Sequence, residues 1–191
     1  LDEVTGQTST DSVGTNNGTL TNGPTWQTGK INNALQFDGV NDFVDHALHT
    51  KELTYSISFW FKALSNTGND TILHRGYAGG CLYNPQVYID DTQLHIKESG
   101  CSNAGLISST NINKNQWYHV SITRDNQTVK FYLDNVLTVT DTNQPTVSAS
   151  GGHFYLGALR GSSGETDFFN GLIDDVRIYN RALSASEVES L

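Results

Sequence analysis

Alternation of apolar and polar residues with a period of two is the feature that most restricts the fold of this chain. Residues 56–61 read Ser-Ile-Ser-Phe-Trp-Phe, which places Ile57, Phe59 and Phe61 on one face of a strand. Residues 117–123 repeat the pattern. Because many such short segments alternate with turn signals rich in Asn, Asp and Gly, the sequence predicts an antiparallel, two-sheet β-sandwich, or jelly roll.

The C-terminus carries the only helix that the sequence predicts. Ser184 and Glu187 have the spacing of a capping box, and Val188 and Leu191 supply a small apolar face. The chain has 191 residues, a usual length for one domain, and shows neither a linker nor a domain boundary. We therefore expect residues 1–191 to form a single all-β domain with a short C-terminal helix.

Charge and composition narrow the classes of partner. The 20 acidic and 11 basic residues give a net charge of −9, which disfavours nucleic acids and anionic membranes and suits cations or neutral polar ligands. No apolar run approaches the roughly 18 residues that span a membrane, so membrane insertion is not expected. The chain contains no methionine, not even an initiator, which suggests a module excised from something longer.

The two cysteines predict a cross-strand disulfide. Cys81 and Cys101 are equidistant from Asp91, and the residues between them read as two strands around a turn at Asp90 and Asp91. In a symmetric hairpin the two thiols face each other, and a disulfide between them implies an oxidising compartment. We therefore expect a secreted, extracellular or cell-surface location. The alternative is two unpaired buried thiols.

Four motifs in order extend along the chain and resemble a known family. They are DSVGTNNGTLTNGPTW with GKINNALQFDGVNDFV, then YSISFWFKA, then NQWYHVSITRD with VKFYLDN, and last FNGLIDDVRIYNRALS. Their order is similar to that of the laminin-G-like jelly-roll family, within the concanavalin A-like lectin and glucanase superfamily. The resemblance implies two curved antiparallel sheets, a frequent structural calcium ion, and secreted multi-domain parents, often polysaccharide-degrading enzymes or adhesins. Residues 75–109 depart most from the pattern, so ligand specificity is expected there.

A structural calcium site is expected where the first polar loop meets the last strand. Asp11, Asn16 and Asn17 lie in one loop rich in Gly and Asn, whose side-chain and carbonyl oxygens suit a hard cation. Asp174 shares a strand face with apolar residues, so its carboxylate needs a cation or several hydrogen-bond donors. The ends of a domain often lie close together, which favours a shared site. The alternative is a loop that bonds its own backbone, with Asp174 capping a turn.

Aromatic and polar residues of the middle and late segments are candidates for sugar binding. A sugar presents C–H faces to aromatic rings and hydroxyl groups to polar side chains. The candidates are His74, Arg75, Tyr77, Tyr83, Asn84, Gln86, Tyr88, His153, Tyr155 and Arg160. We expect the first three to share one loop, and the alternative is that each is an ordinary sheet-face or loop residue.

Two further groups have a structural and a functional interpretation. Trp60 and Trp117 lie opposite the apolar faces of their strands, where they either floor a binding face or pack on the sheet. Asp38, Asp42 and Asp45 either add oxygens to a calcium site or belong to a turn with solvated acids. We favour packing for the tryptophans and the turn for the acids.

Catalytic patterns are weak in this sequence. Glycoside hydrolysis usually needs two carboxylates beside the scissile bond, and no segment carries an E-x-D-x-x-E pattern. Serine-hydrolase, zinc-protease and P-loop motifs are absent as well. We therefore expect a non-catalytic, monomeric, lectin-like module of a larger secreted protein, which binds a polysaccharide or oligosaccharide. A protein-interaction, adhesion or spacer module is the alternative, and an enzyme in its own right is the third hypothesis.

Overall fold

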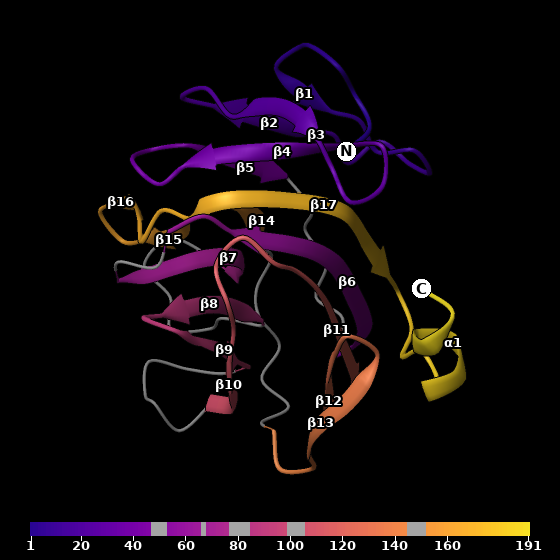
Figure 1. The fold of residues 1–191 in the computed structure, drawn as a ribbon. Coiled ribbons are helices and arrows are strands. Elements are labelled where there is room, and N and C mark those ends of the chain that lie inside the picture. The colour runs from indigo at the N-terminus through magenta and orange to yellow at the C-terminus, as the bar shows by residue number, and fades with distance from the viewer. Residues whose placement is uncertain (47–52, 66–67, 77–84, 99–105, 145–151) are drawn as a thin grey trace.

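The computed structural model describes residues 1–46, 53–65, 68–76, 85–98, 106–144 and 152–191. Within these ranges the chain forms two large antiparallel sheets that pack against each other, a small hairpin, and one short helix, α1 (Ala185–Glu189) (Figure 1). The predicted all-β sandwich is thereby confirmed. No helix in this part of the chain is long and apolar enough to cross a membrane.

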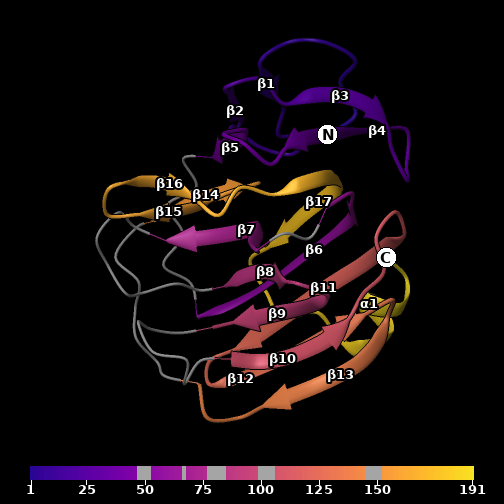
Figure 2. The same ribbon diagram turned by 60° about the vertical axis from the view of Figure 1, so that its left-hand side comes forward.

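The eight-stranded sheet combines early, middle and late segments of the chain. In spatial order it contains β1 (Thr8–Ser9), β2 (Gly18–Thr21), β5 (Phe43–His46), β14 (His153–Leu156), β7 (Asn69–Gly76), β8 (Gln86–Asp90), β9 (Gln93–Lys97) and β10 (Leu106–Asn111). The late strand β14 is thus inserted between the early strands β5 and β7. Beside it lies the small hairpin of β15 (Leu159–Gly161) and β16 (Gly164–Thr166) (Figure 2).

The seven-stranded sheet has β6 and β17 near its centre. In spatial order it contains β13 (Val136–Asp141), β12 (Thr128–Leu133), β11 (Trp117–Asp125), β6 (Thr54–Ala63), β17 (Asn170–Tyr179), β4 (Asn33–Asp38) and β3 (Thr25–Thr28). The strand pairings within both large sheets are antiparallel. The first and last motifs of the chain therefore meet in one sheet, where β4 pairs with β17.

The inner faces of the two sheets form the hydrophobic core. The alternation predicted for residues 56–61 is confirmed, because Ile57, Phe59 and Phe61 of β6 are all buried in that core. Phe37 of β4 is buried in the same layer. Burying a side chain of this kind contributes roughly 1.5–3 kcal/mol, so the layer between the sheets is the main source of cohesion.

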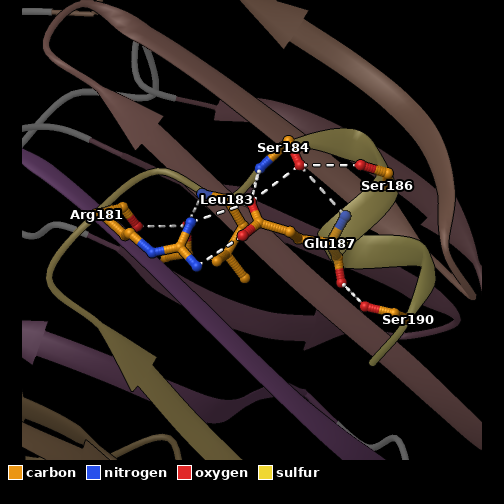
Figure 3. A network of polar contacts seen from close by, with 7 residues as sticks. Arg181, Leu183, Ser184, Ser186, Glu187 and Ser190 are labelled. Atoms are coloured by element: carbon orange, nitrogen blue, oxygen red, sulfur yellow. Dashed lines mark hydrogen bonds and ion pairs between the residues drawn. The ribbon is translucent and has the colours of Figure 1, made fainter.

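Helix α1 covers part of the outer face of the seven-stranded sheet. Its predicted capping box is confirmed: Ser184 Oγ accepts from the Glu187 amide at 3.3 Å, and the Glu187 carboxylate accepts from the Ser184 amide at 2.8 Å. Arg181 donates to the same carboxylate, so one glutamate holds both the helix start and the segment before it (Figure 3). The Leu183 amide donates to Ser56 Oγ of β6, which fixes this segment to the sheet.

A buried ion pair connects the two sheets through the core. Glu98, which follows β9, and Arg124 of β11 are both fully buried, and Arg124 Nη1 lies 2.7 Å from Glu98 Oε2. The Tyr55 hydroxyl of β6 donates to Glu98 Oε1 at 2.6 Å. Burial raises the pKa of Glu98, whereas the charge of Arg124 opposes that shift. The charge of each side chain is therefore compensated by a group from the opposite sheet.

Removing the charge of Glu98 should destabilise the fold strongly. We expect Glu98→Gln to lower the free energy of unfolding by roughly 3–5 kcal/mol, since it leaves the Arg124 guanidinium buried against a neutral amide. Urea denaturation measures the loss. The control is Glu189→Gln at an exposed position of α1, with an expected change within about 0.5 kcal/mol.

The double variant Glu98→Gln/Arg124→Met tests the cause of that loss. It should be more stable than Glu98→Gln alone, because it removes the buried charge that has lost its partner. Wild-type stability of Glu98→Gln would show that the ion pair does not hold the sheets together.

Candidate functional site

The candidate site is built around two side chains of β14 that point away from the core. Successive strand residues face opposite sides, so Phe154 is buried in the core while His153 and Tyr155 lie on the outer face of the eight-stranded sheet. β14 pairs with β7 so that Tyr155 faces His74, and with β5 so that Tyr155 faces Asp45. The strand order therefore places residues from three distant segments in one row.

Three rings stack along this face. The Tyr155 ring lies between the His74 ring, at a centroid distance of 6.1 Å, and the His153 ring, at 5.8 Å, and the planes differ by only 19° and 14°. Phe43 of β5 contacts Tyr155 from the side at 6.3 Å. Tyr155 and His74 are buried, whereas 37 % of the His153 side chain is exposed. The stack thus presents the His153 ring to solvent and uses Tyr155 as its support.

Charged side chains surround the stack. Asp45 Oδ1 lies 2.6 Å from His153 Nδ1. Arg160 of β15 forms an ion pair with Glu165 of β16, and the Arg160 amide donates to His74 Nδ1 at 3.3 Å. About a third of the Asp45 and Arg160 side chains is exposed. We call the following six residues the Tyr155 cluster: Asp45, His74, His153, Tyr155, Arg160 and Glu165.

Burial sets the protonation of the two inner rings. It raises the pKa of Tyr155 to about 12, with a further contribution from the Asp45 carboxylate, so the phenol keeps its proton at neutral pH. Burial lowers the pKa of His74 to about 3, so this imidazole is neutral. The cluster therefore combines a solvent-facing ring, carboxylate acceptors and a guanidinium donor within one small area. These groups complement the C–H face and the hydroxyl groups of a sugar.

The structure brings several of the predicted ligand residues together and separates others. Four of them belong to the Tyr155 cluster: His74, His153, Tyr155 and Arg160. Arg75 lies on the opposite face of β7, with its guanidinium 5.3 Å from the centre of the buried Tyr55 ring. The expectation that a loop already holds His74 and Arg75 is wrong, because β7 continues its pairing with β14 as far as Gly76.

Five of the predicted residues lie outside the described ranges: Tyr77, Cys81, Tyr83, Asn84 and Cys101. Their roles in ligand binding and in a disulfide therefore stay predictions. The predicted hairpin around Asp91 is confirmed, since β8 and β9 pair antiparallel on either side of it.

The other predicted aromatic residues lie apart from the cluster. Tyr88 stacks on His95 at 5.0 Å, further along the eight-stranded sheet. Gln86 of β8, in contrast, lies directly opposite His74 on the same face of the sheet and donates to the Thr71 hydroxyl at 3.1 Å. Trp60 and Trp117 share the outer face of the seven-stranded sheet, where lysine ammonium groups lie 4.7 and 5.0 Å from their ring centres. The tryptophan rings thus already have cationic partners, in agreement with a packing role.

Sequence reasoning missed two charged members of the cluster. Asp45 is assigned above to a turn, yet it lies in β5 two positions after Phe43 and shares its outer face. Residues 43–46 read Phe-Val-Asp-His, which does not alternate apolar with polar residues, so no period-two signal marks this strand. Glu165 carries no such signal, because it reaches the site only through the β15–β16 hairpin, in which it pairs with Arg160.

The residues expected to bind calcium are held in two separate hydrogen-bond systems. The Asp11 carboxylate accepts amide donors of its own loop, including the amide of Asn16, and the Asn17 side chain accepts from the Asp11 amide. Asp174 Oδ2 accepts the amides of residues 30 and 31 at 2.8 Å each. No group of three His, Cys, Asp or Glu residues in the described ranges is arranged to hold a metal ion. These contacts match the alternative of a self-bonded loop and a turn cap, and a calcium ion bound by these residues stays a prediction.

Solved structures with the same architecture come from proteins of different activity. The chain is similar to domain 4 of AbnA, a GH43 extracellular arabinanase from Geobacillus stearothermophilus, in complex with arabinotriose. The identity is 25 % and the TM-score 0.70, over 91 % of this chain and 86 % of that one. It is similar to Trypanosoma rangeli sialidase in complex with sialic acid at 18 % identity and TM-score 0.79, over 100 % of this chain and 31 % of the sialidase. The chain thus spans less than a third of the sialidase.

Two more comparisons concern the fold and the family. A heptameric SAP-like pentraxin from Limulus polyphemus matches at 15 % identity and TM-score 0.64, over 81 % of this chain and 78 % of that one. The pentraxin and sialidase similarities, both below 25 % identity, show the fold alone. A laminin-G family model, described as the concanavalin A-like lectin/glucanases superfamily, matches residues 38–189.

Asp174 should stabilise the fold as a cap of the β3–β4 turn. We expect Asp174→Ala to cost about 1–3 kcal/mol, because it removes the charged acceptor of two part-buried amide hydrogen bonds. The melting temperature should fall by the same amount in calcium and in chelator, and Asp90→Ala at an exposed strand end serves as the control. A loss confined to calcium-containing buffer would instead establish Asp174 as a calcium ligand.

His74 should make the fold sensitive to acid. Its pKa is about 3 when folded, against 6.5 for an ordinary histidine, so below pH 6.5 the unfolded state binds a proton that the folded state does not. Stability should therefore fall by roughly 1.4 kcal/mol per pH unit from pH 6.5 towards pH 3 through this group alone. His74→Phe keeps a ring in the stack and should reduce that slope in denaturation series. Identical slopes for the variant and the wild type would contradict the assignment.

Proposed function

Because the chain belongs to the concanavalin A-like lectin/glucanase superfamily, we propose that it is a non-catalytic carbohydrate-binding module that holds an oligosaccharide at the Tyr155 cluster. The fold is shared by many activities, so the chemistry of the cluster carries the assignment. The supporting observation is the exposed His153 ring on the buried Tyr155, bordered by Asp45 and Arg160. Such a ring with flanking charged groups suits a flat, hydroxylated ligand.

The similarity to the arabinanase domain supports an oligosaccharide as the ligand class. That domain is described in complex with arabinotriose, and the match covers most of both chains. The other structural neighbours support the fold only. We therefore take short neutral oligosaccharides, with arabinotriose first, as the ligands to test.

Preorganised hydrogen bonding explains how the cluster would recognise hydroxyl groups. The Asp45 carboxylate is oriented by His153, and the Arg160 guanidinium by Glu165. These pairs limit side-chain motion before a ligand arrives, which lowers the entropic cost of binding. A sugar must still lose its hydration, so we expect dissociation constants from millimolar to micromolar, or about −4 to −8 kcal/mol.

The pairing of the carboxylates supports binding without bond cleavage. A glycosidase needs one carboxyl group that donates a proton and a second that acts as base or nucleophile. Here Asp45 contacts His153, and Glu165 forms an ion pair with Arg160, so both carboxylates of the cluster are engaged with neighbouring side chains. We propose that any cleavage of the glycan is carried out by another domain or protein.

The proposed function also implies an oligomeric state and a location for the chain. We propose a monomeric module of a larger secreted or cell-surface protein, whose natural ligand is a polysaccharide or oligosaccharide. The oxidising compartment is supported by the expected pairing of Cys81 with Cys101. The structural calcium ion remains an expectation from the family resemblance.

Calorimetric titration of the full chain with arabinotriose and a panel of neutral oligosaccharides tests the proposal. We expect at least one ligand to bind, and Arg160→Ala and His153→Ala each to weaken it at least fivefold, or about 1 kcal/mol, since each removes one contact to the sugar. Arg181→Ala is the matched control, because Arg181 also pairs with a glutamate but lies beside α1. Melting curves confirm that the variants fold.

Two results would contradict the proposal. One is the absence of binding to every sugar of the panel at millimolar concentration. The other is a bound sugar whose affinity is unchanged in Arg160→Ala and His153→Ala, which would place the site elsewhere. Hydrolysis of the same sugars, lost on replacement of Asp45 or Glu165, would contradict the non-catalytic assignment.

A further inference from the structure

Tyr88 and His95 form a second stack of a tyrosine and a histidine on the outer face of the eight-stranded sheet. Val87 and Ile89 of β8 are buried in the core, so Tyr88 between them points outward. His95 of β9 lies directly opposite Tyr88, and the two rings stack at a centroid distance of 5.0 Å with planes 16° apart. Tyr88 is one of the residues predicted to bind a sugar, yet it does not belong to the Tyr155 cluster.

This second stack repeats the construction of the Tyr155 cluster. In both places a tyrosine ring lies nearly parallel to a histidine ring. In both places a carboxylate is close by: Asp45 lies opposite Tyr155, and Asp90, two positions after Tyr88, shares the face of that ring. Gln93, exposed and opposite Asp90, adds an amide group. We call the following four residues the Tyr88 cluster: Tyr88, Asp90, Gln93 and His95.

The two nitrogens of His95 have different surroundings. Nδ1 is buried and has no hydrogen-bond partner among the described residues. An unpartnered buried group costs about 1–3 kcal/mol, a cost that phenylalanine in the same stack would avoid. His95 Nε2 and the Tyr88 hydroxyl are not enclosed in this way, and in the described part of the chain neither has a hydrogen-bond partner. Ring packing alone therefore does not account for the histidine, whereas a hydroxylated ligand gives both outer atoms a partner.

The two clusters lie on one face of the same sheet, across the neighbouring strands β14, β7, β8 and β9 (Figure 2). Tyr155 lies opposite His74 of β7, and His74 lies opposite Gln86 of β8, two positions before Tyr88. Tyr155 and Tyr88 are therefore separated by about 10 Å across the strands and about 7 Å along them. Because His74 and Gln86 are buried, a ligand contacts the two ends of this path rather than its middle.

The charges along this face suit a neutral ligand. The carboxylates of Asp45, Glu165 and Asp90 are accompanied by two cations, Arg160 and Lys97, the latter on β9. An anionic sugar would approach more carboxylates than cations, and a cationic sugar would approach both basic groups. The hydroxyl groups of a neutral sugar, in contrast, can donate to the carboxylates and accept from the cations.

We propose that the Tyr88 cluster is a second sugar subsite, and that the ligand is a neutral, linear polysaccharide bound along its chain. One sugar residue lies against His153 of the Tyr155 cluster while another, further along the same chain, lies against Tyr88 and His95. This inference rests on the proposed function, because it assigns the second contact of the ligand that the Tyr155 cluster holds first. The second contact forms within one complex, so it raises the affinity for long chains above that for short ones.

Calorimetric titration with short and long oligosaccharides of the same sugar tests the second subsite. The probes are arabinobiose with arabinopentaose, xylobiose with xylopentaose, and cellobiose with cellopentaose. In a series that binds, we expect the pentasaccharide to bind at least tenfold more tightly than the disaccharide, or about 1.4 kcal/mol. The larger number of binding registers on a longer chain would by itself give only a few-fold increase.

Tyr88→Ala locates the second contact. It should weaken the pentasaccharide at least fivefold and leave the disaccharide within about twofold of wild type, because only the long chain reaches both clusters. His153→Ala should weaken both lengths. Tyr179→Ala, which removes a partly buried tyrosine of the other sheet, is the matched control and should change neither. Melting curves report whether the variants fold, and Gln93→Ala, at an exposed position, makes the same test if Tyr88→Ala does not fold.

Histidine-ring NMR of the wild-type chain gives a readout without any substitution. A pentasaccharide that contacts both clusters should shift the signals of His95 and His153 with a single midpoint. A disaccharide should shift the two signals with different midpoints, since it fills each subsite independently.

Three outcomes would overturn the second subsite. These are equal affinity for the disaccharide and the pentasaccharide, full pentasaccharide affinity in folded Tyr88→Ala or in Gln93→Ala, and His95 signals that the pentasaccharide does not shift. If binding in these cases is still lost in His153→Ala, the Tyr155 cluster stands as a single site. Absence of binding to every probe at millimolar concentration would contradict the proposed function as well.

Discussion

Two fully buried charges, on Glu98 and Arg124, meet inside the core and connect the two sheets. Apolar contacts between two sheets tolerate small shifts, whereas a buried carboxylate and a buried guanidinium do not, since either one left alone costs several kcal/mol. The Tyr55 hydroxyl adds a third fixed contact. This network sets how one sheet lies over the other, and therefore how the strands that carry the candidate sites are presented.

Neighbouring residues of β7 serve opposite faces of the eight-stranded sheet. On the outer face of the eight-stranded sheet, His74 and Tyr155 form a buried support for the exposed His153 ring. On the inner side, the guanidinium of Arg75, the next residue after His74, lies 5.3 Å from the centre of the buried Tyr55 ring. A shift of one residue along β7 thus moves a side chain from the outer face of the sheet to the core, because successive side chains point to opposite sides.

Membership of a widely shared fold leaves function to local chemistry. The same sandwich is found in an arabinanase domain, a sialidase and a pentraxin. For this chain the relevant local chemistry is the set of charged groups around Tyr155, which supports the proposed glycan-binding module.

The sequence alone determined the strand pattern, the sandwich class and the capping box at Ser184, because alternation and capping depend on residues close together in the chain. It also identified His74, His153, Tyr155 and Arg160 as candidates, but could not show that they meet. That was decided by the tertiary structure, which inserts β14 between β5 and β7 and so brings Tyr155 beside Asp45 and His74.

The hydrogen-bond partners of a buried acid such as Asp174 were likewise determined only by the tertiary structure. Asp174 is directed to the amides of the β3–β4 turn, which local pattern cannot distinguish from a metal ion. Strand order and turn contacts arise from pairings between distant segments, and a period-two pattern says which face a residue occupies but not which neighbour it receives.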